Sequence, residues 1–541
     1  MRITNSIMQN NTLYNINNNK VAEDKLSSQM STGKKVSKPS DDPVVAIRAL
    51  RLHTNVTEVK QYYTYNSSDA ESWMKTTQDA MANLTDIINN LYEQVGKGAK
   101  KGMQSSDLKV ILEEMDSLVQ EYYSIGNTDY AGRFIFTGYR TDTPLTFQEQ
   151  TETQFNINED FTKDSIDEIK YTGFHDLDKI TSENFMKYDR DDLEGKKDSI
   201  VETTLHRIRL AYDNLEYDKN DPDSQKERPK LTLGGQEWKE GSTITWTEQV
   251  DDGTGKMVDQ TKTATITRST VSVNADGKDA AYATLGDNEI RFIPETGELL
   301  LGDNVYKAMM ESDDTLRVNY DKSQWAKGDL NPEHYFSCTK TVPNGDPAKI
   351  TYNIGDNGEN TVADQKIEYD IGYNQKVQVN TNAYECFDPN MQQDINDLRD
   401  AIDQLENIEN TVANLKEYRT RYEEGTDEYK MLTRQIAAAE KAYGYIRDDV
   451  QKRFEHAVTK KQGYLDEADL AITSSGTRNA RLDLAKNRLM EQKTTYESLQ
   501  SENEDSDATE VTVQLKSVQL SYEAALLATS KILQTTLLNY L

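Results

Sequence analysis

The residues whose types could support catalysis or ligand binding do not converge in this sequence. Residues 253–256 (GTGK) resemble a phosphate-binding loop but lack the GxxxxGK[ST] spacing, and they stand between two segments of strand-like pattern. Residues 274–279 (NADGKD) resemble half of a calcium loop, but no glutamate follows at the twelfth position. We therefore interpret the first as a hairpin turn and the second as a polar turn.

The five histidines are far apart in the sequence, and none belongs to an HxxxH or HExxH pair that could bind a metal ion. No GxSxG motif is present. A solvated or structural role is therefore expected for every histidine in the chain: His53, His175, His206, His334 and His456.

Two cysteines, Cys338 and Cys386, lie in a polar middle region, and neither has the sequence context of an activated nucleophile. Two cysteines are too few for a disulfide framework, and the chain has no CxxC spacing. We expect two isolated small side chains, with a single disulfide between them as the alternative.

Adjacent carboxylates occur at Asp41-Asp42, Asp251-Asp252 and Glu423-Glu424, but a chain with 93 acidic residues produces such pairs by chance. The sequence thus predicts no catalytic residue, no metal site, no cofactor and no small-molecule substrate, and we expect a protein that is not an enzyme.

The charge balance limits the partners. Net charge is -31, so the chain repels nucleic-acid phosphates and anionic lipid headgroups, and neither is an expected partner. The N-terminal residues do not have the pattern of a cleaved signal peptide, and no run approaches 18 apolar residues. Hydrophobic residues make up only 35%, as in proteins with long exposed helices or solvated loops.

Helical periodicity dominates the first part of the chain. Asparagine and glutamine crowd residues 5–19, where only weak helix is expected, and Asp42 with Pro43 has the pattern of a helix start. Gly96, Gly98 and Gly102 are expected to end the helix that begins there, and Gly126 to end the next one. A heptad seam runs along the first helix at Met74, Thr77, Met81, Leu84, Ile88, Leu91 and Val95.

The middle region has period-two patterns separated by turn residues, for example in STITWTEQV and TATITRSTVSV. RFIPETGELLLG predicts two short strands around a Glu-Thr-Gly turn, and residues 376–380 (KVQVN) predict another strand. We expect a β-rich or mixed insert with an acidic surface.

Helical periodicity returns after the insert, with an expected break at Ser474, Ser475 and Gly476. The last helix has a seam at Leu515, Val518, Tyr522, Ala525, Thr529, Ile532 and Thr536, and a parallel stripe at Gln519, Leu526, Leu533, Leu537 and Leu541. An apolar face of that width suits a helix with more than one neighbour.

Seams at both ends of the chain need burial partners. The periodicity alone is satisfied by an ordinary helical bundle, but the position of the seams on either side of an insert favours pairing between the chain ends. The predicted fold is mainly α with a β-rich insert, in which N- and C-terminal helices form an antiparallel bundle or coiled coil around a central β or α+β domain.

The expected domains follow from these patterns, and they are a flexible N-terminal assembly segment (1–42), an N-terminal helical rod (43–147), a β-rich central insert (148–390), a helical segment with extra charged helices (391–476), and a C-terminal helix with an assembly tail (477–541).

Several segments resemble a known family. They are MRITNSIMQNN at the start, residues 26–52 (LSSQMSTGKKVSKPSDDPVVAIRALRL), 127–147 (NTDYAGRFIFTGYRTDTPLTF), 474–489 (SSGTRNARLDLAKNRL) and 520–541 (LSYEAALLATSKILQTTLLNYL), with a weaker likeness in 367–387. These are similar to the hook–filament junction proteins of the bacterial flagellin superfamily. The PSDDP form at 39–43 favours a junction protein over flagellin itself, the filament subunit, which is the alternative.

The resemblance implies a structural junction subunit of the bacterial flagellum, secreted through the flagellar type III system without a cleaved signal peptide. Its implied partners are hook-associated protein 1, flagellin, further copies of itself and a flagellar export chaperone. The middle insert and the extra charged segment at 416–473 depart from the family pattern, and surface decoration is the expectation for both. An adhesive, host-facing insert and an enzyme grafted into the insert are the rival hypotheses.

By the same resemblance, residues of the two chain ends form an assembly interface in which neighbouring copies supply burial that a single copy lacks. The residues carried over to it are Arg2, Ile3, Thr4, Leu13, Leu26, Leu526, Leu533, Leu537 and Leu541.

Overall fold

The computed structural model describes residues 5–173, 177–187, 200, 202–216, 229–251, 257–342, 348–356 and 358–538. The chain divides into two compact units. One, which we call the terminal unit, consists of Met1–Ser72, Glu368–Val377 and Arg478–Leu541, and the other, the central unit, consists of Trp73–Ile367 and Gln378–Thr477. Segments from the two ends of the chain therefore fold together.

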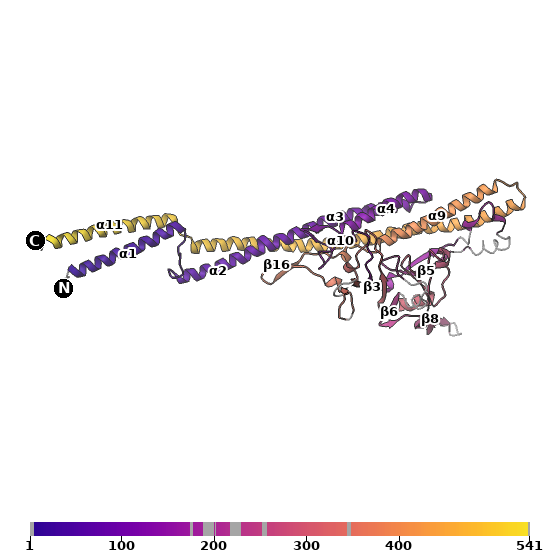
Figure 1. The fold of residues 1–541 in the computed structure, drawn as a ribbon, viewed down its shortest axis with the longest axis horizontal. Helices are drawn as coiled ribbons and strands as arrows, with labels where there is room; N and C mark the ends of the chain where they lie inside the picture. The colour runs from indigo at the N-terminus through magenta and orange to yellow at the C-terminus, as the bar shows by residue number, and fades with distance from the viewer. Residues whose placement is uncertain are drawn as a thin grey trace. The chain divides into compact units, whose positions relative to one another are not determined.

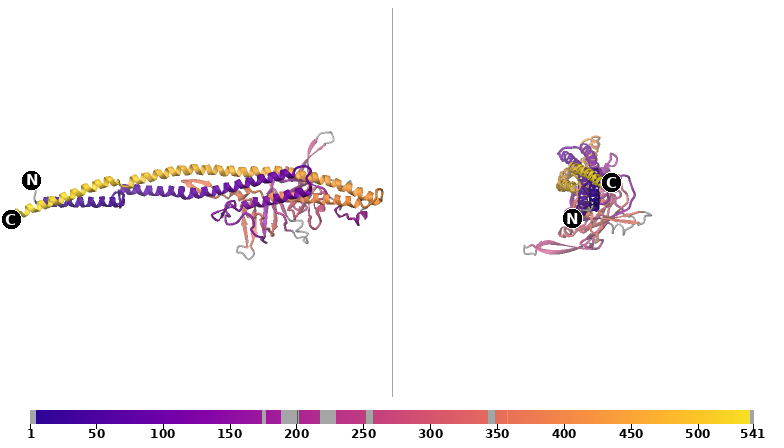
Figure 2. Two further views of the ribbon diagram at one scale, coloured as in Figure 1. Left: turned by 90° about the horizontal axis from the view of Figure 1, so that it is seen from above. Right: turned by 90° about the vertical axis from the view of Figure 1, so that its left-hand side faces the viewer.

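The terminal unit is an antiparallel arrangement of helices. Helix α1 (Asn5–Thr32) lies beside α11 (Ala508–Leu538), as Figures 1 and 2 show. Contacts between side chains or backbone groups follow one register along the unit, because the partner's number falls as the residue number rises: Glu23 with Gln519, Lys34 with Asp505, Val45 with Asn503, His53 with Gln500, and Glu71 with Lys486. The predicted antiparallel pairing of the first and last helices is confirmed.

Helix α2 (Pro43–Lys60) begins as the sequence predicts. The Asp42 carboxylate accepts hydrogen bonds from the backbone N–H groups of Val44 (3.0 Å) and Val45 (3.1 Å), which satisfies two donors that have no partner inside the helix. Pro43 occupies the first turn, where a missing N–H has no consequence. A π-helical turn, η1 (Gln61–Asn66), follows directly.

Helix α1 is longer than the weak helix expected from its asparagines and glutamines. It runs without interruption over Asn5–Thr32 and ends at Gly33, whose φ of 70° suits a glycine at a helix C-terminus. Contacts with α11 stabilise this helix although its residues have low helix propensity. Tertiary packing contributes more to helix stability in proteins than propensity does.

The central unit contains α4 (Ser105–Ile125), α9 (Met391–Arg419) and most of α3 (Ser67–Gly98). Every residue of the predicted α3 seam, from Met74 to Val95, is fully buried. Helix α3 ends at Gly98, where a Cβ atom would lie 2.3 Å from the ring of Phe454, so only glycine fits. Gly126 follows the end of α4, as predicted.

One predicted helix boundary is wrong. Helix α10 (Asp427–Glu504) passes through Ser474, Ser475 and Gly476, where we expected a break. A glycine or serine inside a helix destabilises it by at most about 1 kcal/mol, which the burial of residues such as Ser475, Ala471 and Leu482 offsets.

The β-rich insert is confirmed and contains two sheets. The five-stranded sheet has the order β10-β11-β12-β5-β4, and the six-stranded sheet has the order β15-β14-β3-β13-β6-β7. Within them β10 and β11 run parallel, and the other neighbouring pairs run antiparallel. The predicted turn between Ile293 and Glu298 joins β11 to β12, with Gly297 at a φ of 69°.

The strands of the five-stranded sheet are β4 (Asp167–Tyr171), β5 (Thr203–Arg209), β10 (Thr267–Thr270), β11 (Glu289–Ile293) and β12 (Glu298–Leu301). Those of the six-stranded sheet are β3 (Phe155–Phe161), β6 (Lys230–Leu233), β7 (Gln236–Glu237), β13 (Leu316–Lys322), β14 (Ser337–Thr341) and β15 (Lys349–Tyr352). Three hairpins are separate from both, namely β1 (Asp129–Tyr130) with β2 (Arg133–Phe134), β8 (Thr243–Asp251) with β9 (Met257–Thr265), and β16 (Glu368–Gly372) with β17 (Gln375–Gln378). Short helices α7 (Lys278–Ala281) and α8 (Asp303–Glu311) complete the insert.

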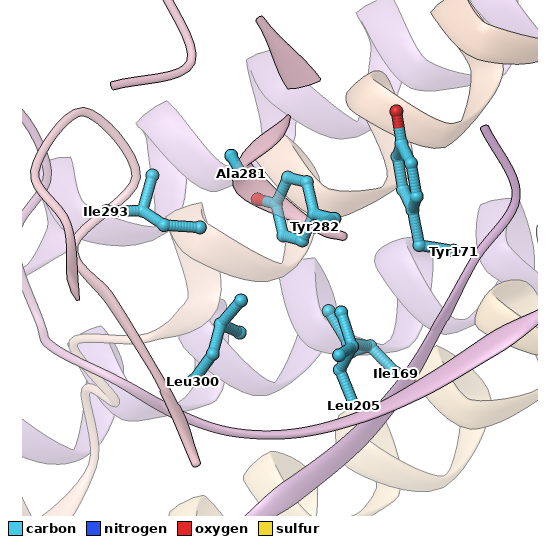
Figure 3. Packing of buried hydrophobic residues seen from close by; sticks show 7 residues of the cluster. All are labelled: Ile169, Tyr171, Leu205, Ala281, Tyr282, Ile293 and Leu300. Carbon is cyan, nitrogen blue, oxygen red and sulfur yellow. The ribbon is translucent and has the colours of Figure 1, made fainter. Parts of the chain in front are cut away.

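Apolar side chains from the five-stranded sheet and α7 form a compact cluster (Figure 3). Tyr171 of β4 stacks on Tyr282, which follows α7, with ring centroids 5.1 Å apart. This stacking joins a loop region to the sheet through buried aromatic surface. The remaining residues of the cluster are Ile169, Leu205, Ala281, Ile293 and Leu300.

A network of buried charges ties the insert to the helices of the central unit. Arg209 of β5 donates to Asp394 (2.7 Å) and Asp397 (2.9 Å) on α9, and the hydroxyl of Tyr464 on α10 donates to Asp394 (2.8 Å). Arg207 also pairs with Asp397. Each buried charge thus has an opposite charge beside it, which is the condition for a charge to be buried at acceptable cost.

Both cysteines, Cys338 and Cys386, are buried and free, so the expectation of two isolated side chains is confirmed. None of the helices in the described part of the chain combines the length and the apolar character needed to cross a membrane.

Candidate assembly interface

The α1–α11 pair has a narrow seam. On α11 five inward-facing positions are those predicted from the sequence, and all are half-buried: Leu515, Val518, Tyr522, Ala525 and Thr529. Val511, one turn earlier and not predicted, is buried. On α1 the corresponding positions are Leu26, which is 9% exposed, and the half-buried Thr12, Ile16, Asn19 and Glu23. A seam with so few apolar residues buries little surface, so the pair is weakly held by its own contacts.

Large apolar side chains on the outer faces of the two helices remain exposed to solvent. Val21 of α1 is 70% exposed, and Leu520 and Leu527 of α11 are 66% and 67% exposed. Scattered single apolar residues are ordinary on protein surfaces, but a concentration of them on two adjacent helices indicates a surface that another molecule covers. Others on the same pair are Ile7, Met8, Leu13, Tyr14, Met30, Val513 and Leu526.

A joint connects this pair to the rest of the terminal unit. The helices are interrupted between α1 and α2, at Gly33–Asp42, and between α10 and α11, at Asp505–Asp507. These two helix breaks lie side by side. The N–H of Lys35 donates to the carbonyl of Glu504 (2.6 Å), and the N–H of Ser506 donates to the carbonyl of Gly33 (2.9 Å). These backbone hydrogen bonds hold the two helix interruptions next to each other.

Charged side chains reinforce the joint. The Lys34 ammonium lies 2.6 Å from the Asp505 carboxylate and 3.3 Å from that of Glu504. The hydrogen bond from Lys34, with help from Ser501, lowers the pKa of Asp505, and the same bond raises the pKa of Lys34. Asp507 caps α11 by accepting hydrogen bonds from the N–H groups of Thr509 and Glu510, which lower its pKa.

A polar groove of about 320 Å³ lies further along the terminal unit. It is lined by Tyr62 of η1, by Tyr373 at the tip of the β16–β17 hairpin, and by Arg488 and Tyr496 of α10. The hairpin is anchored by hydrogen bonds from Asn66 to the carbonyl of Asp370 (2.8 Å) and from Tyr369 to Asp69. Tyr373 is 81% exposed.

The interface residues carried over from the family have different settings in the structure. Leu13 and Leu526 are 54% and 43% exposed, and Leu26 lies in the seam. Leu533 and Leu537 lie on α11, although their side chains fall outside the described set. The other four lie outside the described residues altogether: Arg2, Ile3, Thr4 and Leu541.

Sequence reasoning missed other residues of this surface. Val21, Leu520 and Leu527 were not selected, because they lie outside the three-four seams that the periodicity search follows. Lys34 and Asp505 were not selected either, since their ion pair forms only because two helix interruptions lie side by side. Large apolar residues off the seam were the signal available for the first group.

The histidines considered as metal ligands or catalytic groups lie in different environments. His53 is 3.2 Å from Glu504, His206 stacks on Tyr306, and the pKa of buried His334 is lowered to about 4 by desolvation. Half-burial likewise lowers the pKa of His456, and His175 lies outside the described residues. Within the part of the chain that the structure describes, no group of three or more His, Cys, Asp or Glu side chains is placed to hold a metal ion.

Of the two loop-like motifs, residues 274–279 form a turn that leads into α7. Asp276 accepts a hydrogen bond from the N–H of Ser272 (3.1 Å), within the turn that contains residues 274–276. Residues 252–256 lie outside the described residues, but Asp251 and Met257 on either side of them are paired across the β8–β9 hairpin.

Comparisons with known proteins identify the class. The family model described as the bacterial flagellin N-terminal helical region matches residues 3–141. Flagellar hook-associated protein 3 of Escherichia coli is 26% identical over 225 residues, which are 40% of this chain and 70% of that protein. The protein of the same name from Salmonella typhimurium is 25% identical over 228 residues, covering 40% of this chain and 71% of that protein.

Among solved structures, the chain is similar to Xanthomonas campestris FlgL at 12% sequence identity, with 84% of this chain and 99% of that chain covered. The TM-score is 0.25, so the sequence matches alone carry the assignment. Residues 3–141 thus match the N-terminal helical region of bacterial flagellins. The curated relatives that the chain matches are both flagellar hook-associated protein 3, and they support a location in the bacterial flagellum.

Proposed function

We propose that the chain is the junction subunit that joins the hook, through hook-associated protein 1, to the flagellin filament. The family match supports a structural role in the flagellum, and the α1–α11 pair supplies a physical means of assembly. We further propose that residues 1–42 and 477–541 hold the assembly segments.

One observation carries this proposal. The apolar stripe of α11 beyond its seam remains uncovered in a single copy, with Leu520, Leu526 and Leu527 all exposed. Covering such side chains contributes on the order of 25 cal/mol per Å² of apolar surface, so copies that pack side by side stabilise each other's terminal helices. Of the interface residues carried over from the family, Leu13 and Leu26 belong to α1, and Leu526, Leu533 and Leu537 belong to α11.

Repetition makes modest contacts sufficient. In a ring or helix each copy touches several neighbours, so the second and later contacts are effectively intramolecular. Contacts of this kind are heterologous, with different surfaces meeting, and they are compatible with a helical lattice. Hook-associated protein 1 on one side and flagellin on the other then meet surfaces of the same assembled layer.

We also propose export through the flagellar type III system, with an export chaperone binding the free protein before assembly. The sparse burial along α1 and α11 supports this, because segments with few buried side chains open at low free energy. A secretion assay on a chain that lacks residues 5–20 tests the route. Unchanged secretion of that chain would contradict it.

The assembly proposal is tested with the triple variant Leu520→Ser, Leu526→Ser and Leu527→Ser in cells that lack the unmodified chain. The free variant should keep its circular dichroism spectrum and thermal midpoint, because the three side chains are already exposed. Filaments counted by electron microscopy should fall at least tenfold, and flagellin should accumulate in the medium.

The matched control replaces the same three residues by methionine, which keeps an apolar surface of similar volume. It should restore most filaments. Normal filament numbers in the serine variant would rule out this surface as the assembly interface. Equal loss in both variants would rule out an apolar mechanism.

A further inference from the structure

The β8–β9 hairpin forms a sheet of its own, at the margin of the β-rich region in Figure 1. Its strands pair along their full length, from Thr243 opposite Thr265 to Asp251 opposite Met257. Among the described residues, neither strand has a second strand as neighbour. Each strand therefore has one outer edge, and the two edges have different surroundings.

The outer edge of β8 is occupied. The backbone N–H of Thr247 donates to both carboxylate oxygens of Glu311 at the end of α8, at 2.8 Å each. Ile244 and Trp246 of the same strand are buried. A side chain that accepts from the edge N–H and a helix against the strand leave no room for a further strand on this side.

The Thr247 bond also sets the hydrogen-bonding phase of the hairpin. Since the N–H of Thr247 points away from β9, its partner Thr261 is in a non-hydrogen-bonded pair, and the N–H and C=O of Thr261 point away from β8. Alternation then turns the N–H and C=O groups of every second residue outward along β9: Met257, Asp259, Thr261, Thr263 and Thr265.

Within the described ranges of the chain, no strand pairs with this edge of β9. Every side chain of the strand is exposed or half-exposed, including Met257 at 55% and Val258 at 39%. The strand contains no proline, and its pairing with β8 contains no bulge. Natural sheets usually block a long edge with such features, so an unblocked edge of nine residues indicates a site for strand addition.

We propose that β9 pairs antiparallel with β9 of a second copy of this chain, about a two-fold axis at Thr261. In that register all nine residues find partners, and the outward groups of the five odd-numbered residues form the ladder. Val258 lies opposite the partner copy's Ala264, and Gln260 opposite its Lys262. On the other face Asp259 lies opposite Thr263, where a hydroxyl can donate to the carboxylate.

Self-pairing fits the charges of this strand. No charge meets a like charge when the axis passes through Thr261. Moving the axis by one residue to Lys262 places two lysines directly opposite each other, which is destabilising. Moving it to Gln260 leaves Ala264 and Thr265 opposite residues outside the strand, without partners in it. The centre of the strand is thus also its best two-fold position.

This contact goes beyond the proposed junction role. A two-fold interface is closed and cannot propagate along a polar helical assembly. It therefore applies to two free copies in solution, or to copies on two separate assemblies. Loss of this contact leaves filament numbers unchanged, so the two proposals fail independently.

Disulfide trapping tests the register in the full chain. Thr261→Cys should give a disulfide-linked dimer on mild oxidation, because residues 261 of the two copies face each other at about 5.5 Å between Cα atoms. Thr263→Cys should remain monomeric, since it lies about 13 Å from its counterpart. Thr245→Cys on β8 is an exposed control, and both native cysteines are buried. Equal trapping at 261 and 263, or none at 261, overturns the proposal.

A charge series provides a second test that does not depend on folding. Gln260→Lys places two lysine pairs across the interface, and Gln260→Glu places two glutamate–lysine pairs there. Sedimentation velocity should show self-association weakened about twofold to tenfold by the first change and strengthened by a similar factor by the second. Within the hairpin Gln260 faces Glu248, so any effect on hairpin stability has the opposite sign. Association that follows hairpin stability instead would contradict the two-fold pairing.

Discussion

Lys34 and Asp505 are 471 positions apart in the sequence, and the Lys34 ammonium donates a hydrogen bond of 2.6 Å to the Asp505 carboxylate. The same two residues form an isolated antiparallel bridge. Two breaks in two long helical segments therefore coincide, and the α1–α11 pair beyond them is held to its unit by a short set of backbone and side-chain bonds.

The Lys34→Met variant should loosen this joint. Both side chains are partly exposed, so the loss in free energy is expected to stay below about 1 kcal/mol. Amide exchange of residues 33–36 and 505–507 should become about twofold to fivefold faster, measured by hydrogen–deuterium exchange with mass spectrometry. Lys25→Met, on an exposed face of α1, should change nothing at the joint.

The pH dependence of the joint follows from the same pair. Because the pKa of Asp505 is lowered in the folded protein, its contribution to the stability of the joint is present above the ordinary carboxyl pKa of about 4. That stability is lost as pH falls through the lower pKa of the folded state. The raised pKa of Lys34 extends the pair into alkaline solution. In a His53→Gln background, which removes the imidazole beside Glu504, exchange at the joint, corrected for intrinsic rates, should therefore be flat between about pH 5 and 9 and should rise only in acid. A change near pH 7 would contradict this assignment.

A buried carboxyl predicts a pH dependence of the opposite sign for the insert. Desolvation raises the pKa of Glu159 to about 7, although Tyr320 and the N–H of Ala211 donate to it. Stability from this group is fully present below its unfolded pKa of about 4.3 and is lost as pH rises through 7, by about 3 kcal/mol in total.

Glu159→Gln should abolish that dependence. Buried His334 adds a pH dependence of the opposite sign to both chains, so the Glu159 effect is read as the difference between them. Urea denaturation followed by tryptophan fluorescence should show that the variant gains stability relative to the unmodified chain as pH rises from 5 to 8. Trp325 is a suitable probe, because Tyr212 of the neighbouring segment packs against it with ring centroids 5.0 Å apart. Glu149→Gln, at an exposed position, is the control and should retain the slope.

Removing the acceptor at the centre of the buried charge network should destabilise the central unit strongly. Asp394→Ala leaves Arg209 and the fully buried Lys461 without that counter-charge, and breaking a buried pair typically costs about 3–5 kcal/mol. The measurement is the urea midpoint of the central transition. Asp403→Ala on the same helix removes only a half-exposed partner of Lys109, and its effect should stay below about 1 kcal/mol. Equal effects would show that the network is not the stabilising element.

The terminal helices should exchange their amide hydrogens far faster than the central ones in the free protein. Leu26 and Val511 are the buried apolar residues that α1 and α11 contribute among their described positions, whereas the α3 seam is buried throughout. We expect protection in α3 and α4 to exceed that in α1 and α11 by at least a hundredfold. Assembly onto hook-associated protein 1 should slow exchange in the terminal pair. Equal protection in the free protein would contradict the assembly scheme.

Much of the helical architecture was predictable because its signals are local. The seam from Met74 to Val95 and the seam from Leu515 to Thr529 are three-four patterns, and both face inward as predicted. The start of α2 at Asp42 and the end of α4 at Gly126 follow from capping chemistry within a few residues. The antiparallel pairing of the chain ends followed from the need to bury two such stripes.

Only the tertiary structure decided the rest. Ser474 to Gly476 remain helical because packing along α10 offsets a weak local preference, and the Asn-rich start is helical beside α11. Arg209 meets Asp394, and Lys34 meets Asp505, across separations at which sequence carries no pairing signal. Tertiary structure likewise decides that Glu311 covers the outer edge of β8 while no described strand pairs with β9. Periodicity and capping are encoded in neighbouring residues, whereas ion pairs, sheet order and free edges arise only when distant segments come together.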